Sequence, residues 1–189
     1  MRSRANTYTY QTILRDRPAR EITIRTAAGN RQRGWLQLDG RAIPVALGRG
    51  GIRTDKREGD GGTPRGVFHP VRLWWRADRH ARPRTALPAR RITAADAWSE
   101  DPTERRYNQP IQIRDGESGD RLKREDHLYD FIIEIDHNTR PTIPGRGSAV
   151  FLHLARDNFA ATAGCVGMRR EAMLRLLARL GPKTRIVID

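Results

Sequence analysis

The chain has 189 residues, a mass of 21.6 kDa, a net charge of +14 and a single cysteine. This length suits one domain with its own hydrophobic core, and one cysteine excludes an intramolecular disulfide and a multi-cysteine zinc site. The chain contains no run of 18 apolar residues, so we expect no membrane span, and its basic N-terminus shows no apolar run typical of a secretory signal peptide.

Charge is distributed unevenly along the chain. Residues 49–91 contain 12 basic and four acidic side chains, whereas residues 92–140 contain seven basic and 12 acidic ones. An acidic segment between basic ones argues against a continuous nucleic-acid-binding surface, so we expect no nucleic-acid partner. The basic segments would still attract a polyanion, including a cell-wall polymer. An Arg-rich polyanion-binding module with a structural cysteine therefore stays open as one interpretation.

The N-terminal half predicts a short tail followed by strands. Residues 1–20 are polar, and we expect them to be poorly ordered before a single domain over residues 21–189. Alternation predicts a strand over 21–26, and Asp39-Gly40 between two alternating runs predicts a β-hairpin of 35–38 with 41–47. Pro44 would place the second hairpin strand at an edge or a bulge. The Gly-rich segment 48–66 is predicted to be a loop.

The C-terminal half predicts further strands and one helix. Strands are expected over 67–75, 128–136, 148–155 and 184–188, and the proline-punctuated stretch at about 76–125 is expected to be an insertion folded over the core. Met173, Leu176, Leu177 and Leu180 recur at helical spacing, so a helix is predicted over 169–180, ended by Gly181-Pro182. The predicted fold class is mainly β with a small α component.

Cys165 is the first candidate for chemistry. It lies between Gly164 and Gly167, after a strand and shortly before the predicted helix. The helix N-terminus and Arg169 with Arg170 would favour its thiolate form. A buried cysteine that acts only as a small hydrophobe is the alternative.

His153 is the second candidate. It precedes Cys165 by 12 residues at the end of a predicted strand, from which it could act as the base that a nucleophilic cysteine requires. No two of the His, Cys and carboxylate residues fall at a metal-ligand spacing, so we expect neither a metal site nor a cofactor.

Two segments together resemble a known family. Residues 145–168, GRGSAVFLHLARDNFAATAGCVGM, resemble the active-site segment of L,D-transpeptidase catalytic domains of the YkuD type, in which a strand ends in His and a loop leads to Ser/Thr-x-Gly-Cys. Residues 56–68, KREGDGGTPRGVF, resemble the second signature of that family. Two positions depart from the usual pattern: Ala163 stands where His is common, and Gly167 where Arg is common. The interval from His153 to Cys165 is also short.

The resemblance implies a β-sandwich-like catalytic domain with one helix after the cysteine, acting on peptidoglycan stem peptides. Cys165 would attack the donor peptide to form a thioester and release D-Ala, with His153 as base, and an acceptor amine would then take the acyl group. The backbone at Gly164 would help to bind the oxyanion, and Thr162 would hold that turn. Tyr129, Arg146, Thr162 and Arg169 are our candidates for substrate contacts.

The same resemblance places the protein in the periplasm or cell wall. A Cys-dependent L,D-carboxypeptidase or amidase, which passes the acyl group to water, is the nearest alternative. The acceptor, the export route and the oligomeric state stay open at this stage.

Overall fold

The computed structural model describes residues 17–114 and 116–189, so most of the predicted N-terminal tail lies outside the described residues. Within it, Ala19 is tied to the C-terminal part of the chain. Its N–H donates to the Arg179 carbonyl at 2.7 Å, and its carbonyl accepts the Thr184 hydroxyl, also at 2.7 Å. The first described residues therefore lie against the segment that follows the helix.

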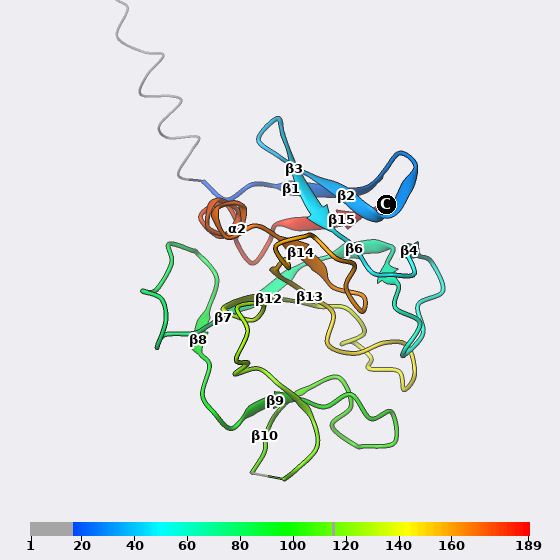
Figure 1. Ribbon diagram of the computed structural model, residues 1–189, viewed down its shortest axis with the longest axis vertical. Coiled ribbons are helices and arrows are strands. Elements are labelled where there is room, and N and C mark those ends of the chain that lie inside the picture. The colour runs from blue at the N-terminus through cyan, green and yellow to red at the C-terminus, as the bar shows by residue number, and fades with distance from the viewer. Residues whose placement is uncertain (1–16, 115) are drawn as a thin grey trace, which may run out of the picture.

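The predicted fold class is confirmed: the described part of the chain is mainly β with one helix (Figure 1). The strands are β1 Glu21–Ala27, β2 Asn30–Leu38, β3 Arg41–Ala46, β4 Ile52–Arg53, β5 Thr63–Pro64, β6 Gly66–Phe68, β7 Pro70–Trp75, β8 Ala89–Arg91, β9 Asp96–Trp98, β10 Pro110–Gln112, β11 Asp120–Arg121, β12 Phe131–Ile135, β13 Phe151–Leu154, β14 Val166–Met168 and β15 Arg185–Ile188, and the helix is α2 Arg170–Leu177.

Ten strands form one mixed sheet that wraps around the main hydrophobic core. Their order is β6-β15-β1-β2-β3-β14-β13-β12-β7-β8. Side chains from both ends of this order, among them Phe68 on β6 and Trp75 on β7, meet in one buried cluster with Leu152 and the helix residue Met173. Strands that are far apart in the sheet share this core, so the sheet must curve back on itself around it.

The hairpin over β2 and β3 is formed as predicted. Asp39 and Gly40 have φ angles of 50° and 74°, which are the left-handed values that a two-residue turn of this kind requires. Pro44 pairs with Trp35 on β2, whereas β3 meets β14 only where Ala46 pairs with Gly167. Pro44 therefore lies on the part of β3 that has no strand on its second side, where a missing N–H costs nothing.

Three predicted strands prove shorter or divided. The predicted strand 67–75 is two strands, because β6 pairs with β15 whereas β7 pairs with β12. The predicted strand 148–155 contains β13 only from Phe151, since Ala149 has a φ of 50° that interrupts extended backbone. The strand predicted over 128–136 begins at Phe131, because the residues before it form a turn.

The helix covers the core as its sequence pattern predicts. It spans Arg170–Leu177 rather than 169–180, and Met173, Leu176, Leu177 and Leu180 are all buried in the main cluster. No described helix has the length and apolarity needed to cross a membrane.

The segment 76–125 divides between the two faces of the central strands: β8 adds to the edge of the large sheet beside β7, whereas residues 92–122 pack on the other face. Figure 1 shows β9 and β10 on the opposite side of β7, β12 and β13 from β1–β3. Trp98 and Leu122 of this segment join Trp74, Phe151 and Cys165 in a second buried cluster. Strand residues alternate between the two clusters: on β7, Leu73 faces the main core and Trp74 the second one. Residues of this segment therefore cover the face that carries the cysteine, and its being an insertion stays a prediction.

Candidate active site

His153 lies on β13, and Cys165 directly precedes the neighbouring parallel strand β14. Strand β13 pairs with β14 in a register that joins Leu152 to Val166 and His153 to Gly167. Cys165 comes directly before Val166, and both Cys165 and His153 line one pocket of about 320 Å³. The ladder between the two strands thus holds the nucleophile candidate and the base candidate in a fixed relation.

The cysteine turn depends on glycine. Gly164 has a φ of 147°, and a Cβ at this position would lie 2.9 Å from the Gly62 carbonyl oxygen. Side chains other than that of glycine are disfavoured by both the angle and the contact. The Thr162 hydroxyl does hold this turn: it donates to the Cys165 carbonyl at 2.6 Å and accepts the Gly164 N–H at 3.1 Å.

The loop over residues 56–68, which resembles the second family signature, contacts the turn that carries Cys165. Lys56 is only 7% exposed and pairs with Asp60 at 2.8 Å, and Asp60 also accepts the Gly62 N–H at 2.7 Å. Gly62 is the residue whose carbonyl contacts Gly164. The two segments that resemble the family signatures are therefore in contact, although about ninety residues separate them in the chain.

The resting cysteine is a buried thiol, contrary to the sequence expectation of a stabilised thiolate. Burial raises the pKa of Cys165 to about 12, with the side chain 8% exposed. Its Sγ donates to the Ala149 carbonyl at 3.2 Å and accepts the Phe151 N–H at 3.3 Å. Strand β14 lies between Cys165 and α2 in the chain, and the help expected from the helix N-terminus stays a prediction.

His153 is held as a neutral imidazole of one tautomer. Burial lowers its pKa to about 4. Nδ1 lies 2.7 Å from the Leu154 carbonyl, which can only accept, so Nδ1 carries the proton and Nε2 keeps a lone pair. The ring also packs edge-on against Tyr129 at a centroid distance of 5.4 Å. A neutral histidine with a bare nitrogen is the form that can remove a proton.

Two of the four predicted substrate-contact residues line the cysteine pocket and two do not. Thr162 and Tyr129 line it, and the Tyr129 hydroxyl donates to Asp120 at 2.8 Å. Arg146 instead pairs with exposed Asp55 outside this pocket. Arg169 lies with its guanidinium carbon 5.2 Å from the centre of the Phe159 ring.

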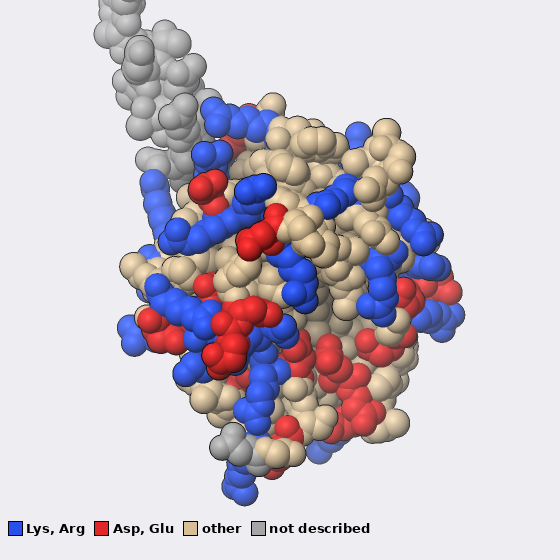
Figure 2. Space-filling model, viewed as in Figure 1, with Lys and Arg blue, Asp and Glu red and all other residues tan. Residues whose placement is uncertain are grey.

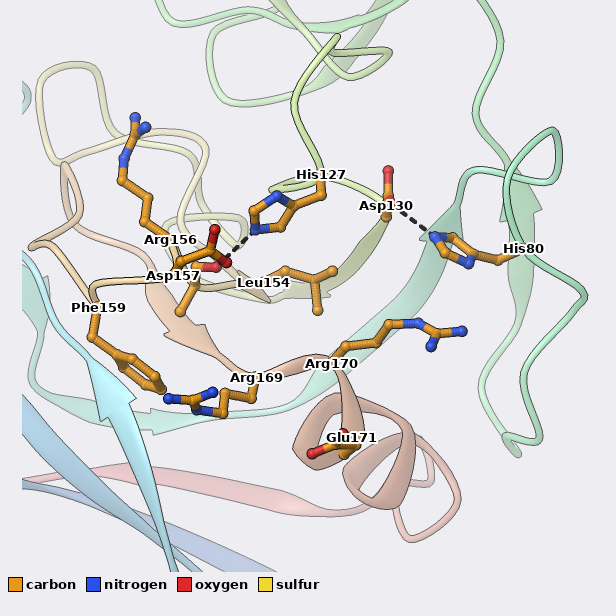
Figure 3. Close-up of a pocket in the computed structure, with 11 residues that line it drawn as sticks. His80, His127, Asp130, Leu154, Arg156, Asp157, Phe159, Arg169, Arg170 and Glu171 are labelled. Carbon is orange, nitrogen blue, oxygen red and sulfur yellow. Dashed lines mark hydrogen bonds and ion pairs between the residues drawn. The ribbon is translucent and has the colours of Figure 1, made fainter.

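Arg169 belongs to a neighbouring pocket of about 420 Å³ (Figure 3). This pocket shares Ala155 and Arg156 with the cysteine pocket. Figure 3 shows Arg170 extending toward the pair of His80 and Asp130, whose ring nitrogen and carboxylate oxygen are 2.7 Å apart. The pocket that contains Arg169 is lined by both carboxylates and arginines, so its lining is not dominated by one sign of charge.

Three arginines at the cysteine pocket escaped the sequence reasoning. Arg49, Arg124 and Arg156 line it, and they come from three separate segments of the chain. Because 33 of the 36 basic residues are arginine, composition offered no signal that would select these three. Among the described residues, no group of three or more His, Cys, Asp or Glu side chains is arranged to hold a metal ion.

A cysteine and a neutral histidine in one pocket of a mainly β domain are the parts of a cysteine-nucleophile enzyme. A family model described as the L,D-transpeptidase catalytic domain (YkuD) matches residues 19–188, and the chain belongs to this family. Among solved structures, it is similar to the crystal structure of a cysteine-to-serine mutant of an Enterococcus faecium L,D-transpeptidase, with 14% sequence identity and a TM-score of 0.39. That match covers 92% of this chain and 50% of the other, so this chain spans about half of that protein's length. A comparison with curated proteins finds no match.

Proposed function

We propose that the domain is a peptidoglycan L,D-transpeptidase that works through a thioester on Cys165. The observation that carries this proposal is the shared pocket, which is lined by both Cys165 and a histidine whose tautomer is set by the Leu154 carbonyl. Family membership supports the stem peptide of peptidoglycan as the substrate class.

In the first half of the proposed reaction, His153 Nε2 takes the thiol proton as Sγ attacks the donor carbonyl. The C–N bond then breaks, and His153 returns the proton to the leaving amine, which leaves a thioester. Since burial disfavours a free thiolate, we expect proton transfer and attack to occur together once the donor has displaced water.

In the second half, an acceptor amine attacks the thioester and gives its proton to His153. The C–S bond breaks, a new amide forms, and Sγ regains a proton. The Gly164 N–H is engaged by Thr162, so the N–H of Cys165 itself is our candidate donor to the oxyanion, with Gly164 acting by shaping the turn.

Purified stem peptides and mass spectrometry test this function. A donor tetrapeptide with an added amine acceptor should yield the cross-linked product and release the terminal D-residue. Release without cross-linking would identify the Cys-dependent carboxypeptidase that water as acceptor would give. A carbapenem should also acylate Cys165, adding its whole mass because its ring opens without a leaving group. If neither the cross-linked or released product nor the carbapenem adduct forms, the proposal is contradicted and the Arg-rich polyanion-binding module is favoured.

The proposed substrate implies action in the periplasm or cell wall. The basic side chains spread over the upper part of the molecular face in Figure 2 would favour encounter with an anionic wall polymer. Acidic side chains gather mostly in the lower half of that face, on the side of β9 and β10.

A further inference from the structure

Strands β1–β3 carry exposed side chains on the face that is turned away from the main core. Ile24 on β1 and Leu36 on β2 are buried in that core. Because side chains alternate along a strand, their neighbours Arg25 and Trp35 point to the opposite, outward side. Figure 1 shows these strands on the far side of the molecule from β9 and β10. The outward face is therefore a different surface from the one that carries the cysteine.

Trp35 lies at the centre of this surface. The ladder pairs it with Arg25 on one side and with Pro44 on the other, and one step along the strands Thr23 pairs with Gln37. Directly paired side chains on one face of a sheet are in contact range. We call the set of these five residues the outer sheet face: Thr23, Arg25, Trp35, Gln37 and Pro44.

Trp35 also differs from the other three tryptophans of the chain. Its side chain is 45% exposed, whereas Trp74, Trp75 and Trp98 are buried. One exposed aromatic ring is common on protein surfaces. What distinguishes this ring is that a guanidinium, an amide and a hydroxyl, all able to form hydrogen bonds, lie within one or two residues of it on the same face.

Strand β1 places polar side chains between two apolar pairs of this surface. Trp35 and Pro44 form one pair, and Val187 and Val67 on β15 and β6 form the other. Thr23 on β1 pairs with Val187 and so lies between them. A stable protein–protein interface is most apolar at its centre, which this surface is not.

A sugar chain matches this alternation. A pyranose ring has apolar C–H faces that stack on an indole, and its hydroxyl groups lie at the rim, where polar side chains can bond them. Neighbouring strands are about 4.8 Å apart, which is close to the length of one unit of a β-linked glycan. A glycan that crosses the strands would therefore present about one sugar to each strand.

The charge of the surface favours a glycan that bears carboxylates. Two carboxylates of β1 and of the end of the chain are already paired: Glu21 with Arg185 at 2.8 Å, and Asp189 with Arg65. Arg25, next to the indole ring, has no carboxylate partner among the described residues. The positive charge that is left unpaired is thus the one beside the stacking ring.

We propose that the outer sheet face binds the glycan strand of peptidoglycan, with a sugar ring stacked on Trp35 and Arg25 paired with a carboxylate of the strand. Glycan binding rests on this surface alone. Its use, which is to hold the wall polymer while a stem peptide enters the cysteine pocket, rests on the proposed function. The pairing of Ala46 on β3 with Gly167 on β14 joins the glycan-binding strands to the strand that follows Cys165.

Glycan strands stripped of their stem peptides by an amidase test the proposal, because they offer Cys165 no amide to attack. Each muramyl sugar of such a strand carries a free carboxylate. Since the other tryptophans are buried, binding should shift the fluorescence emission of Trp35 to the blue and protect it from acrylamide. Trp35→Thr, which keeps a strand-forming residue, should raise the calorimetric Kd at least about tenfold. Ile143→Thr, at a side chain 49% exposed in the loop before β13, is the matched control and should leave the Kd unchanged.

Stripped strands whose carboxylates have been reduced to alcohols test the role of Arg25. The unsubstituted protein should bind the reduced strands about two- to fivefold more weakly than the native ones, as an exposed ion pair would give. Arg25→Gln should cost a similar factor on the native strands and nothing on the reduced strands. Arg106→Gln, at an exposed arginine of the segment 76–125, should change neither Kd.

Four outcomes would overturn glycan binding at this surface. They are no saturable binding of the stripped strands, a Kd that Trp35→Thr leaves unchanged, binding of polyglutamate as tight as that of the glycan, and a dimer in sedimentation that Trp35→Thr dissociates. The third would show general attraction of an Arg-rich surface to polyanions, and the fourth an interface between two copies of the chain. Glycan binding without any cross-linking of stem peptides would instead contradict the transpeptidase function and leave the outer sheet face standing.

Discussion

Strand β13 separates two regions that are built differently. On one side, Val150, Leu152 and Leu154 enter a core to which strands from both ends of the sheet contribute. On the other, Phe151 packs in one cluster with Cys165 and Trp98, and Trp98 comes from the segment 76–125. The first region follows from hydrophobic alternation and serves stability. In the second region a chain segment with little regular pattern covers Cys165 and sets its surroundings, so the candidate site depends on the part of the chain whose sequence predicts least of its structure.

Replacing the cysteine should separate the two regions most sharply. Cys165→Ala is expected to lower turnover at least about a thousandfold, because the nucleophile and its base act as a unit. The free energy of unfolding should change by only about 1 kcal/mol, since one small buried group is removed. Steady-state kinetics and urea unfolding on the same preparation measure both. Retained turnover would show that the second region is not catalytic.

On the core side of the same strand, we expect a substitution to lower stability and to leave turnover nearly unchanged. Leu152 is fully buried, and Leu152→Ala should lower the free energy of unfolding by about 2–5 kcal/mol through lost burial and a cavity. Turnover per folded molecule should stay near that of the unsubstituted protein. Val67→Ala, at a side chain 47% exposed, is the control and should cost no more than about 0.5 kcal/mol. Similar costs at both positions would contradict the assigned core.

The glycine of the cysteine turn tests how closely the second region is positioned. Gly164→Ala should lower kcat about ten- to a hundredfold, because the new Cβ meets the Gly62 carbonyl and displaces the sulfur. Gly29→Ala is the matched control: its φ is 74°, but a Cβ there has no neighbour within 4 Å. It should cost some stability through backbone strain and leave kcat unchanged. A harmless Gly164→Ala would show that the turn tolerates movement.

The pH dependence of alkylation tests whether the sulfur is buried as a thiol, and it involves no substitution. A raised thiol pKa of about 12 means that the thiolate fraction, and with it the iodoacetamide rate, rises about tenfold per pH unit from pH 8 to 10. A thiol at the reference pKa of 9.0 would level off within this range. A plateau already at pH 7 would show that the thiolate is preformed, as the sequence first suggested.

The sequence predicted the elements whose patterns are local. The Asp39-Gly40 turn, the buried face of α2 and the existence of β12 and β13 all depend on neighbouring residues. The division of 67–75 into two strands could not be predicted in this way, because it depends on which strands pair with β6 and β7.

The site shows the same limit. Cys165, His153 and Thr162 were named from local context, and the structure places all three at one pocket. The thiol's ionisation was misjudged because its burial comes from Trp98 and other residues of a distant segment. Arg124 was missed for the same reason, since only the folded chain brings it to the pocket that His153 also lines. The order of residues alone does not show that a distant segment buries Cys165, or that arginines from separate segments line one pocket.

The parallel pairing of β13 with β14 has a consequence for how relatives of this domain are recognised. The register that pairs His153 with Gly167 fixes where the histidine lies relative to Cys165, and residues 156–161 connect β13 to the turn that precedes the cysteine. We therefore expect insertions or deletions in that connection to leave His153 and Cys165 in place. We expect the interval of 12 residues between them to vary in length among relatives, so a search that demands a fixed spacing would overlook proteins with the same ladder.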